Sequence, residues 1–266
     1  MHEAIREITP TKTANLMIFG MFGVGKTVFA ATGGPKTLIL RPPIDHTDSI
    51  LTMGWPAAQR PKEWVVRDWP EMDEVSSYLL HEGDEWDWVW LDSISLFQDS
   101  GLDNIWDDTI TRKPSRKEFG PDKSEYGVNM WRLAEWVRQV VGMDTFNFGI
   151  TAHPELLVDP EDGEERLMPW VQGKKMSARM CGYMNTVGYL DERTHSETNE
   201  VYRLLTVHKT DRFYAKDQFG IKDGKILNPT VPKFMAAIKA ARTPAAAVKK
   251  SSAAKPATTK RRRKSA

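Results

Sequence analysis

The sequence is poor in the features that mark secreted and membrane proteins. Its 266 residues include a single cysteine, Cys181, which excludes an internal disulfide and is typical of a protein of the reducing cytoplasm. No apolar run approaches the roughly 18 residues that a membrane-spanning helix needs, and the first residues, MHEAIREITPTKT, lack the apolar core of a signal peptide. We therefore expect a cytoplasmic protein without membrane contact.

Acidic residues are missing from the last part of the chain. From Arg242 onward there are nine basic side chains and no acidic ones. Residues 1–241 carry 28 basic against 36 acidic side chains, so the net charge of +1 conceals an acidic body and a basic end. Residues 242–266 also lack the apolar content to build a core. We expect a polar lead-in over 1–14, one folded domain over 15–241 and a disordered basic tail over 242–266.

The pattern G-x-x-x-x-G-K-[ST], which defines the phosphate-binding P-loop, occurs once near the start. Its glycines allow the backbone N–H groups to curl around phosphates, the lysine reaches the β- and γ-phosphates, and the threonine hydroxyl ligates magnesium. ATP and Mg²⁺ are thus the expected cofactors. The expected nucleotide-binding residues are Gly20, Met21, Phe22, Gly23, Val24, Gly25, Lys26, Thr27 and Val28.

A bulky apolar run that ends in an acid follows at WDWVWLDS, residues 86–93. A buried parallel strand that finishes on an aspartate supplies the second magnesium residue of P-loop proteins, because the carboxylate lies beside the P-loop at the carboxyl edge of the sheet. We therefore assign Asp92 to this role, together with Thr27 as a magnesium ligand.

Apolar patterning predicts alternating strands and helices along the rest of the domain. The expected strands cover 15–20, 37–40, 63–69, 86–92, 146–151, 186–191 and 201–208, and the expected helices cover 71–81, 93–111, 126–141, 174–184 and 232–242. Residues 44–61 are expected to be a loop, and 159–163 a turn between two short strands. The alternation predicts an α/β fold: an open, mostly parallel sheet with helices on both faces.

In the order of its motifs the chain resembles the RecA-like P-loop ATPases, especially the compact versions that tailed phages use in single-strand annealing and recombination. The resemblance rests on GMFGVGKT, WVWLDSISLF, FGITAH and RLLTVHKTDRFYAKDQFG, and it covers residues 15–220. It implies an ATPase that binds single-stranded DNA, self-associates into a ring or filament, and works with a single-strand-binding or recombination protein.

The same resemblance implies roles for two further residues. His153 stands at the strand end where these ATPases place a polar sensor of the γ-phosphate; the alternative is a histidine that merely ends a strand. Lys216, in AKDQFG, matches a lysine that related ring and filament ATPases extend to the nucleotide of a neighbouring subunit, where a cation stabilises the charge that develops in phosphoryl transfer.

The chain departs from the family pattern at two places. The arginine expected beside that lysine is Gln218, so one cationic finger is missing unless Arg212 replaces it. No glutamate follows the second strand to activate water; Asp45 or His46 takes that place, or both are ordinary loop residues. Binding of ATP is accordingly better supported by the sequence than fast hydrolysis.

Basic residues occupy the loops that face DNA in RecA-like proteins. The candidates for DNA contact are Arg112, Lys113, Arg116, Lys117, Lys174, Lys175 and Arg179, with Arg261, Arg262 and Arg263 in the tail. Each can neutralise a phosphate and make binding dependent on salt. The alternative is an ordinary solvated surface.

Three functions are compatible with these motifs. The first is a DNA-stimulated ATPase with catalytic residues Lys26, Asp92, His153, Lys216 and Asp45. The second is an ATP-gated DNA-binding or assembly protein with little turnover, which Gln218 and Pro43 favour. The third is a P-loop phosphotransferase acting on a small molecule, against which the chain has no arginine-rich lid near the P-loop.

Overall fold

The computed structural model describes residues 9–159, 161–173 and 175–243. The strands of its main sheet are β1 (Asn15–Phe19), β2 (Thr37–Arg41), β3 (Lys62–Val65), β4 (Trp88–Leu91), β5 (Asn147–Ala152), β8 (Thr186–Thr194), β9 (Val201–Thr206), β10 (Lys216–Asp217) and β11 (Lys225–Leu227). A separate hairpin consists of β6 (Pro154–Val158) and β7 (Glu165–Pro169). The helices are α1 (Lys26–Ala31), α2 (Asp48–Leu51), α3 (Trp69–Glu82), α4 (Ile94–Arg112), α5 (Lys123–Val141), α6 (Met176–Tyr183) and α7 (Val231–Arg242).

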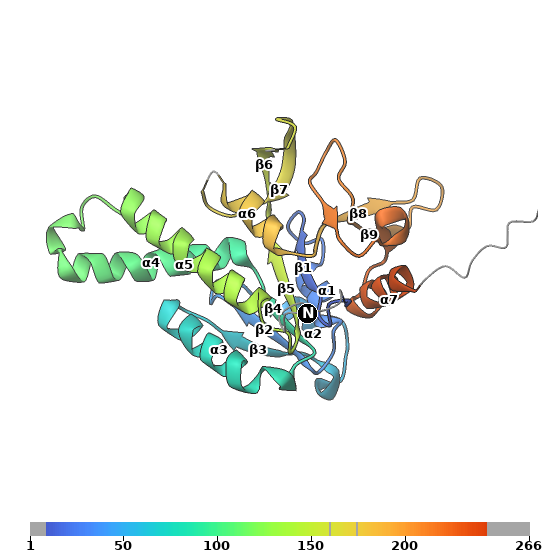
Figure 1. Ribbon diagram of the computed structural model, residues 1–266, viewed down its shortest axis with the longest axis horizontal. Helices are drawn as coiled ribbons and strands as arrows, with labels where there is room; N and C mark the ends of the chain where they lie inside the picture. Colours follow the sequence, from blue (N-terminus) through green and yellow to red (C-terminus); the bar gives the residue numbers. More distant parts are fainter. Residues whose placement is uncertain (1–8, 160, 174, 244–266) are drawn as a thin grey trace, which may run out of the picture.

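The main sheet has the strand order β11-β9-β8-β1-β5-β4-β2-β3, and β10 pairs with β8 (Figure 1). Its strands from β8 to β3 are mutually parallel, whereas β9, β10 and β11 are antiparallel to their partners. Helices cover both faces, which confirms the predicted fold class. The order also puts β5 between the P-loop strand β1 and the strand β4 that precedes Asp92.

Two cores, one on each face, explain why the central strands are mostly apolar. In β4, Val89 and Leu91 point into a core with α3, α4, α5 and α6, while Trp88 and Trp90 point into a core with α1 and α7. Successive side chains of a strand alternate between faces, so a strand covered twice needs apolar residues at every position. Gly149 in β5 makes room for the Trp90 indole, since a Cβ there would lie 2.2 Å from the ring.

Capping residues set the starts of two helices earlier than apolar spacing predicted. Helix α3 begins at Trp69 because the Asp68 side chain accepts a hydrogen bond from the backbone N–H of Glu71. Helix α5 begins at Lys123 because Asp122 and Glu125 form a reciprocal capping box. In both helices the capping side chain accepts a hydrogen bond from a backbone N–H group that a helix start otherwise leaves unsatisfied.

The remaining predictions are confirmed in part: the expected strand over 63–69 is shorter, since β3 ends at Val65 and Trp69 already belongs to α3, and strands β10 and β11 were not predicted. The predicted turn near Gly163 does join two short strands, β6 and β7. Residues 44–61, expected to be a loop, contain the short helix α2 and one turn of 3₁₀ helix. Within the residues that the structure describes, no helix combines the length and the apolar character that a membrane span requires.

Candidate active site

The ends of three parallel strands bring the predicted site residues together. Phe19 pairs with Ala152, so the P-loop after β1 starts beside His153 after β5. On the other side, Leu91 pairs with Ile150, which puts Asp92 next to Thr151. The carboxyl ends of parallel strands share one edge of a sheet, and ligands of open α/β proteins bind at that edge. A cavity of about 370 Å³ opens there.

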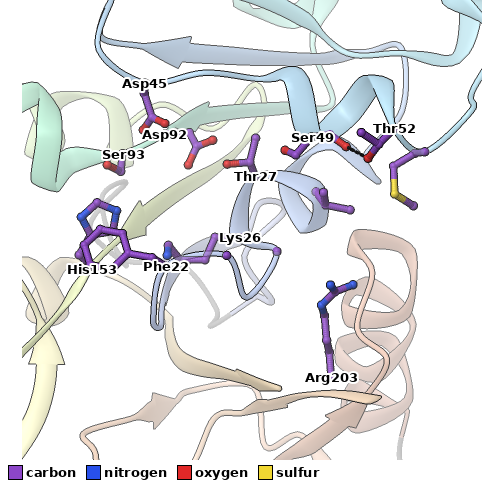
Figure 2. Close-up of a pocket in the computed structure, with 14 residues that line it drawn as sticks. Phe22, Lys26, Thr27, Asp45, Ser49, Thr52, Asp92, Ser93, His153 and Arg203 are labelled. Atoms are coloured by element: carbon purple, nitrogen blue, oxygen red, sulfur yellow. Dashed lines mark hydrogen bonds between the residues drawn. The ribbon is translucent and has the colours of Figure 1, made fainter. Parts of the chain in front are cut away.

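The P-loop forms one wall of this cavity (Figure 2). Gly23 and Gly25 adopt positive φ angles of 76° and 97°, which residues with a Cβ rarely adopt. Six of the nine residues that the motif predicts to bind nucleotide line the cavity: Phe22, Gly23, Gly25, Lys26, Thr27 and Val28. No side chain caps the start of α1, so the first N–H groups of this helix remain available to an acceptor in the cavity. Val24 instead packs into the core below the loop.

Lys26 is only 8% exposed, and its amine is held by the loop itself. Nζ donates to the carbonyl oxygens of Gly20 at 2.8 Å and Met21 at 3.0 Å. Burial lowers the pKa of the Lys26 amine, against the opposing effect of the nearby carboxylates of Asp92 and Asp45. An anion in the cavity would favour the charged amine that burial disfavours.

Asp92 lies at the floor of the cavity and is 3% exposed. The hydroxyl of Thr151 donates to Asp92 Oδ1. Burial raises the pKa of the Asp92 carboxyl above its usual range. Hydrogen bonds from Thr151 and Thr27 and the charge of Lys26 offset this rise only in part. Thr151 was not among the predicted residues, although a threonine inside an apolar strand just before His153 is a visible signal.

These groups fit a magnesium ion bound together with nucleotide phosphates. Thr27 and Asp92 line the same cavity and offer the hard oxygen ligands that Mg²⁺ takes. The neighbouring Ser93 hydroxyl is buried and has no hydrogen-bond partner among the described residues, so it can pair with a water of the ion. A cation at this place would also offset the burial cost of the Asp92 charge.

Of the two candidates for activating water, only Asp45 lines the cavity. The turn after β2 puts it there, because Arg41 donates from Nη1 to the Asp45 carbonyl at 2.8 Å and is held in turn by Glu63 at 2.8 Å. His46 faces another cavity, with Arg41 and Glu63. The geometry thus separates two residues that the sequence left equivalent.

His153 lies across the cavity from Asp45 and packs against Phe22 in a tilted arrangement, with ring centroids 4.4 Å apart and 51° between the ring planes (Figure 2). Burial and the charge of Lys26 lower the pKa of the His153 imidazole, which favours its neutral form. Ser95 holds the backbone: its Oγ accepts from His153 N at 2.9 Å and donates to the Trp170 carbonyl at 2.8 Å. The end of β5 is thereby fastened to the exit of the β6–β7 hairpin.

An arginine that sequence reasoning missed enters the cavity from the opposite side. Arg203 of β9 lines it at the end remote from Asp92 and His153 (Figure 2). A Cβ at Gly25 would lie 3.1 Å from Arg203 Nε, which shows how closely this side chain approaches the P-loop; the positive φ angle is what favours glycine there. No local motif marks Arg203, because the pairing of β9 with β8 alone brings it to the P-loop.

Lys216 and its neighbours lie outside this cavity. The Lys216 amine donates to the carbonyl oxygens of Cys181 and Gly182, both at 3.3 Å, near the end of α6. Gln218 is tied within its own chain, since its Oε1 accepts from Asn185 Nδ2 at 3.1 Å. Arg212 is exposed beside β7. A role for these residues at the nucleotide of a neighbouring subunit stays a prediction.

The predicted DNA-contact residues fall into two separate groups. One surrounds the turn between α4 and α5, at the left end of Figure 1, and the other lies at α6, near its upper middle. In the first group Arg116 is engaged by Glu125 at 2.7 Å and Asp122 at 2.8 Å, and Arg112 by Asp108 at 3.6 Å. Of the candidates that the structure describes, Lys113, Lys117, Lys175 and Arg179 are exposed and form no ion pair there, although Arg179 Nε donates to the Tyr183 hydroxyl at 2.7 Å. Lys174, Arg261, Arg262 and Arg263 lie outside the described residues.

Fold and site together define a P-loop nucleotide-binding protein. Residues 12–219 match the family described as the AAA domain, which is most of the chain, so the chain belongs to this family. This family assignment supports nucleotide binding and hydrolysis by the cavity.

Among solved structures, the chain is similar to the flagellar accessory protein FlaH from Methanocaldococcus jannaschii. The sequences are 11% identical, the similarity covers 82% of this chain and 85% of FlaH, and the TM-score is 0.44. No curated protein sequence matches the chain.

Proposed function

We propose that the chain is a cytoplasmic ATPase that acts on single-stranded DNA in phage recombination or replication. The observation that carries this proposal is the cavity in which the P-loop, Asp92, Asp45 and His153 meet at one sheet edge. A triphosphate laid along the P-loop brings its terminal phosphate between Lys26 and His153. These are the polar groups that phosphoryl transfer needs around the transferred phosphate.

In the proposed reaction, Asp45 orients a water and accepts its proton as the water oxygen attacks the γ-phosphorus. The bond to the oxygen of ADP then breaks. Lys26 leaves the carbonyl oxygens of its own loop for the phosphates, and the neutral His153 hydrogen-bonds the γ-phosphate. Thr27 and Asp92 would hold Mg²⁺, which supplies charge neutralisation on the phosphate oxygens.

Single-stranded DNA as the partner is supported by exposed cations. Lys113, Lys117 and Lys175 are exposed on the described surface, and so is Arg179, which also bonds Tyr183. Nine basic residues from Arg242 onward add a salt-dependent attraction to phosphates. The link from His153 through Ser95 to Trp170 provides a path between the γ-phosphate and the hairpin. Lys216 fits a role across a subunit contact in a ring or filament, with a single-strand-binding or recombination protein as a further partner.

A second function, ATP-gated DNA binding or assembly with little turnover, is favoured by one observation. Gln218 replaces the expected second cation and is bonded to Asn185. A neutral amide held in its own chain does not stabilise charge at another nucleotide. Slow turnover with ATP-dependent DNA binding is the expected behaviour in that case.

ATP turnover with and without single-stranded DNA tests the proposal. We expect phosphate release that DNA stimulates and that Lys26→Ala abolishes, because the buried amine lies on the P-loop itself, where the phosphates are proposed to bind. Lys36→Ala, an exposed lysine just before β2, is the matched control and should retain turnover. If the chain binds DNA only in the presence of ATP but does not hydrolyse the ATP, the second function is supported. If the chain does not bind DNA and DNA does not change ATP turnover, both functions are contradicted.

A further inference from the structure

A second cavity continues the phosphate site on the side away from Asp92. It measures about 240 Å³, and it shares Gly25, Val28, Met53 and Arg203 with the first cavity. A nucleotide whose terminal phosphate lies at His153 and whose middle phosphate lies at the P-loop must leave the loop toward Val28. The second cavity is therefore where the remainder of the molecule arrives.

The lining of this second cavity suits a flat aromatic ring. Its walls are largely apolar, with Val28 and Phe29 from α1, Met53 after α2, Leu190 from β8 and Pro229 before α7. Ligand sites of this kind combine apolar walls with a few placed polar groups that fix orientation. Asn228 and Arg203 are such groups here.

Asn228 presents its amide NH₂ in a fixed direction. Its Oδ1 accepts from Arg203 N at 2.9 Å, its backbone N–H donates to the Arg203 carbonyl at 2.7 Å, and its own carbonyl accepts from Lys233 Nζ at 2.8 Å. These three bonds hold the residue at a positive φ of 43°. Within the described part of the chain, Nδ2 forms no hydrogen bond, so the donor is free for a ligand.

Arg203 stands where the two cavities join. Its guanidinium lies against Gly25, and its only ion pair among the described residues, with Glu192, is a long one at 3.4 Å. A planar cation at this junction can lie over a ring face while remaining near phosphate charge.

We propose that the second cavity binds the nucleobase of the nucleoside triphosphate, with Asn228 Nδ2 donating to an acceptor of the ring and Arg203 covering the ring at the junction. This inference rests on the proposed function, because it requires the triphosphate to lie along the P-loop. It assigns Asn228 and Arg203 to nucleotide recognition, a role that no motif in the sequence indicates.

Calorimetric titration of the full chain with Mg-ATP and with Mg-tripolyphosphate, which lacks a base, tests the assignment. Asn228→Asp keeps the oxygen that accepts from Arg203 N and removes the NH₂ donor. The new carboxylate acts on the phosphates of both ligands, whereas the lost donor acts on the base alone. We therefore expect ATP affinity to fall about tenfold more than tripolyphosphate affinity, which is the usual worth of one such hydrogen bond. Asn199→Asp is the matched control, because Asn199 has a similar φ of 58° in the exposed β8–β9 turn.

Arg203→Gln gives a second, independent readout and should also lower ATP affinity more than tripolyphosphate affinity. Equal losses for both ligands, or unchanged ATP affinity in both variants while Lys26→Ala still abolishes binding, would overturn the base site and leave the phosphate cradle standing. If the wild-type chain binds neither ligand, the proposed function itself fails.

Discussion

Asp92 is subject to opposing demands. A metal-binding carboxylate must be ionised, yet burial raises the pKa of Asp92 and makes its charge costly in the absence of a cation. The Thr151 hydroxyl supports one oxygen, and Lys26 is held by the P-loop carbonyls instead of pairing with the acid. In the ligand-free protein, the buried charge of Asp92 therefore destabilises the fold, and a bound cation would remove this destabilisation.

This cost predicts that Asp92→Asn stabilises the ligand-free protein while abolishing ATP turnover. The amide oxygen still accepts from Thr151, and the buried charge is gone. Because the raised pKa belongs to an acid, the cost of the charge is present above that pKa and disappears as the pH falls below it. Thermal unfolding at pH 7.5 should show a melting temperature about 2–4 °C higher, for a gain of about 1 kcal/mol.

The rise in melting temperature caused by Asp92→Asn should shrink toward zero as the pH is lowered toward the ordinary pKa range of aspartate. Asp87→Asn, an exposed aspartate just before β4, should leave the melting temperature unchanged at every pH. A lower melting temperature for Asp92→Asn at pH 7.5 would show that the ionised carboxylate stabilises the fold.

At the scale of elements, a basic residue in the α4–α5 turn stabilises the contact between the two helices. Arg116 lies 5.2 Å from the centre of the Trp106 ring and pairs with both acids of the capping box, Asp122 and Glu125. Arg116 and the N-terminal backbone N–H groups of α5 lower the pKa of Glu125 to about 2. The arginine thereby joins the end of α4 to the start of α5.

We therefore expect Arg116→Ala to lower the melting temperature at neutral pH. A lowered carboxyl pKa contributes stability that is present above the unfolded value of 4.5 and is lost as the pH falls from there toward about 2. The difference between variant and wild type should narrow across that window in thermal unfolding followed by circular dichroism. Arg112→Ala, whose pair with Asp108 is exposed, serves as the control and should unfold like the wild type. Equal melting temperatures for Arg116→Ala and wild type would show that the contacts of Arg116 do not stabilise the fold.

Most elements could be predicted from the sequence, because both-face burial and helical spacing are local signals. Helix starts were displaced where caps such as Asp68 and Asp122 act, since the apolar pattern begins only after the cap. The insertion of β5 between β1 and β4 could not be predicted, because strand order depends on pairing between distant segments. For the same reason Thr151 and Arg203 were missed, although the P-loop and Asp92 were found from their motifs.

At the scale of the whole molecule, we propose that the site is shared between neighbouring subunits, with Lys216 supplied by a second copy of the chain. One chain brings the P-loop, Asp92, Asp45 and His153 to a single cavity. Lys216 lies elsewhere, with its amine on the carbonyl oxygens at the end of α6. A head-to-tail assembly repeats one contact around a ring or along a filament, so a residue on one face of each subunit can complete a site on the next.

This arrangement predicts that two inactive variants restore each other. Lys216→Ala keeps the P-loop half, and Lys26→Ala keeps the lysine that we propose to cross the contact. In an equal mixture, about a quarter of head-to-tail contacts combine an intact P-loop with an intact Lys216, so about a quarter of wild-type turnover should return. ATP turnover measured before and after mixing provides the test. A mixture of Lys26→Ala with Asp92→Asn should stay inactive, because both residues belong to the same half of the site. Absence of recovery in the first mixture, with both variants folded, would return Lys216 to a structural role at the end of α6.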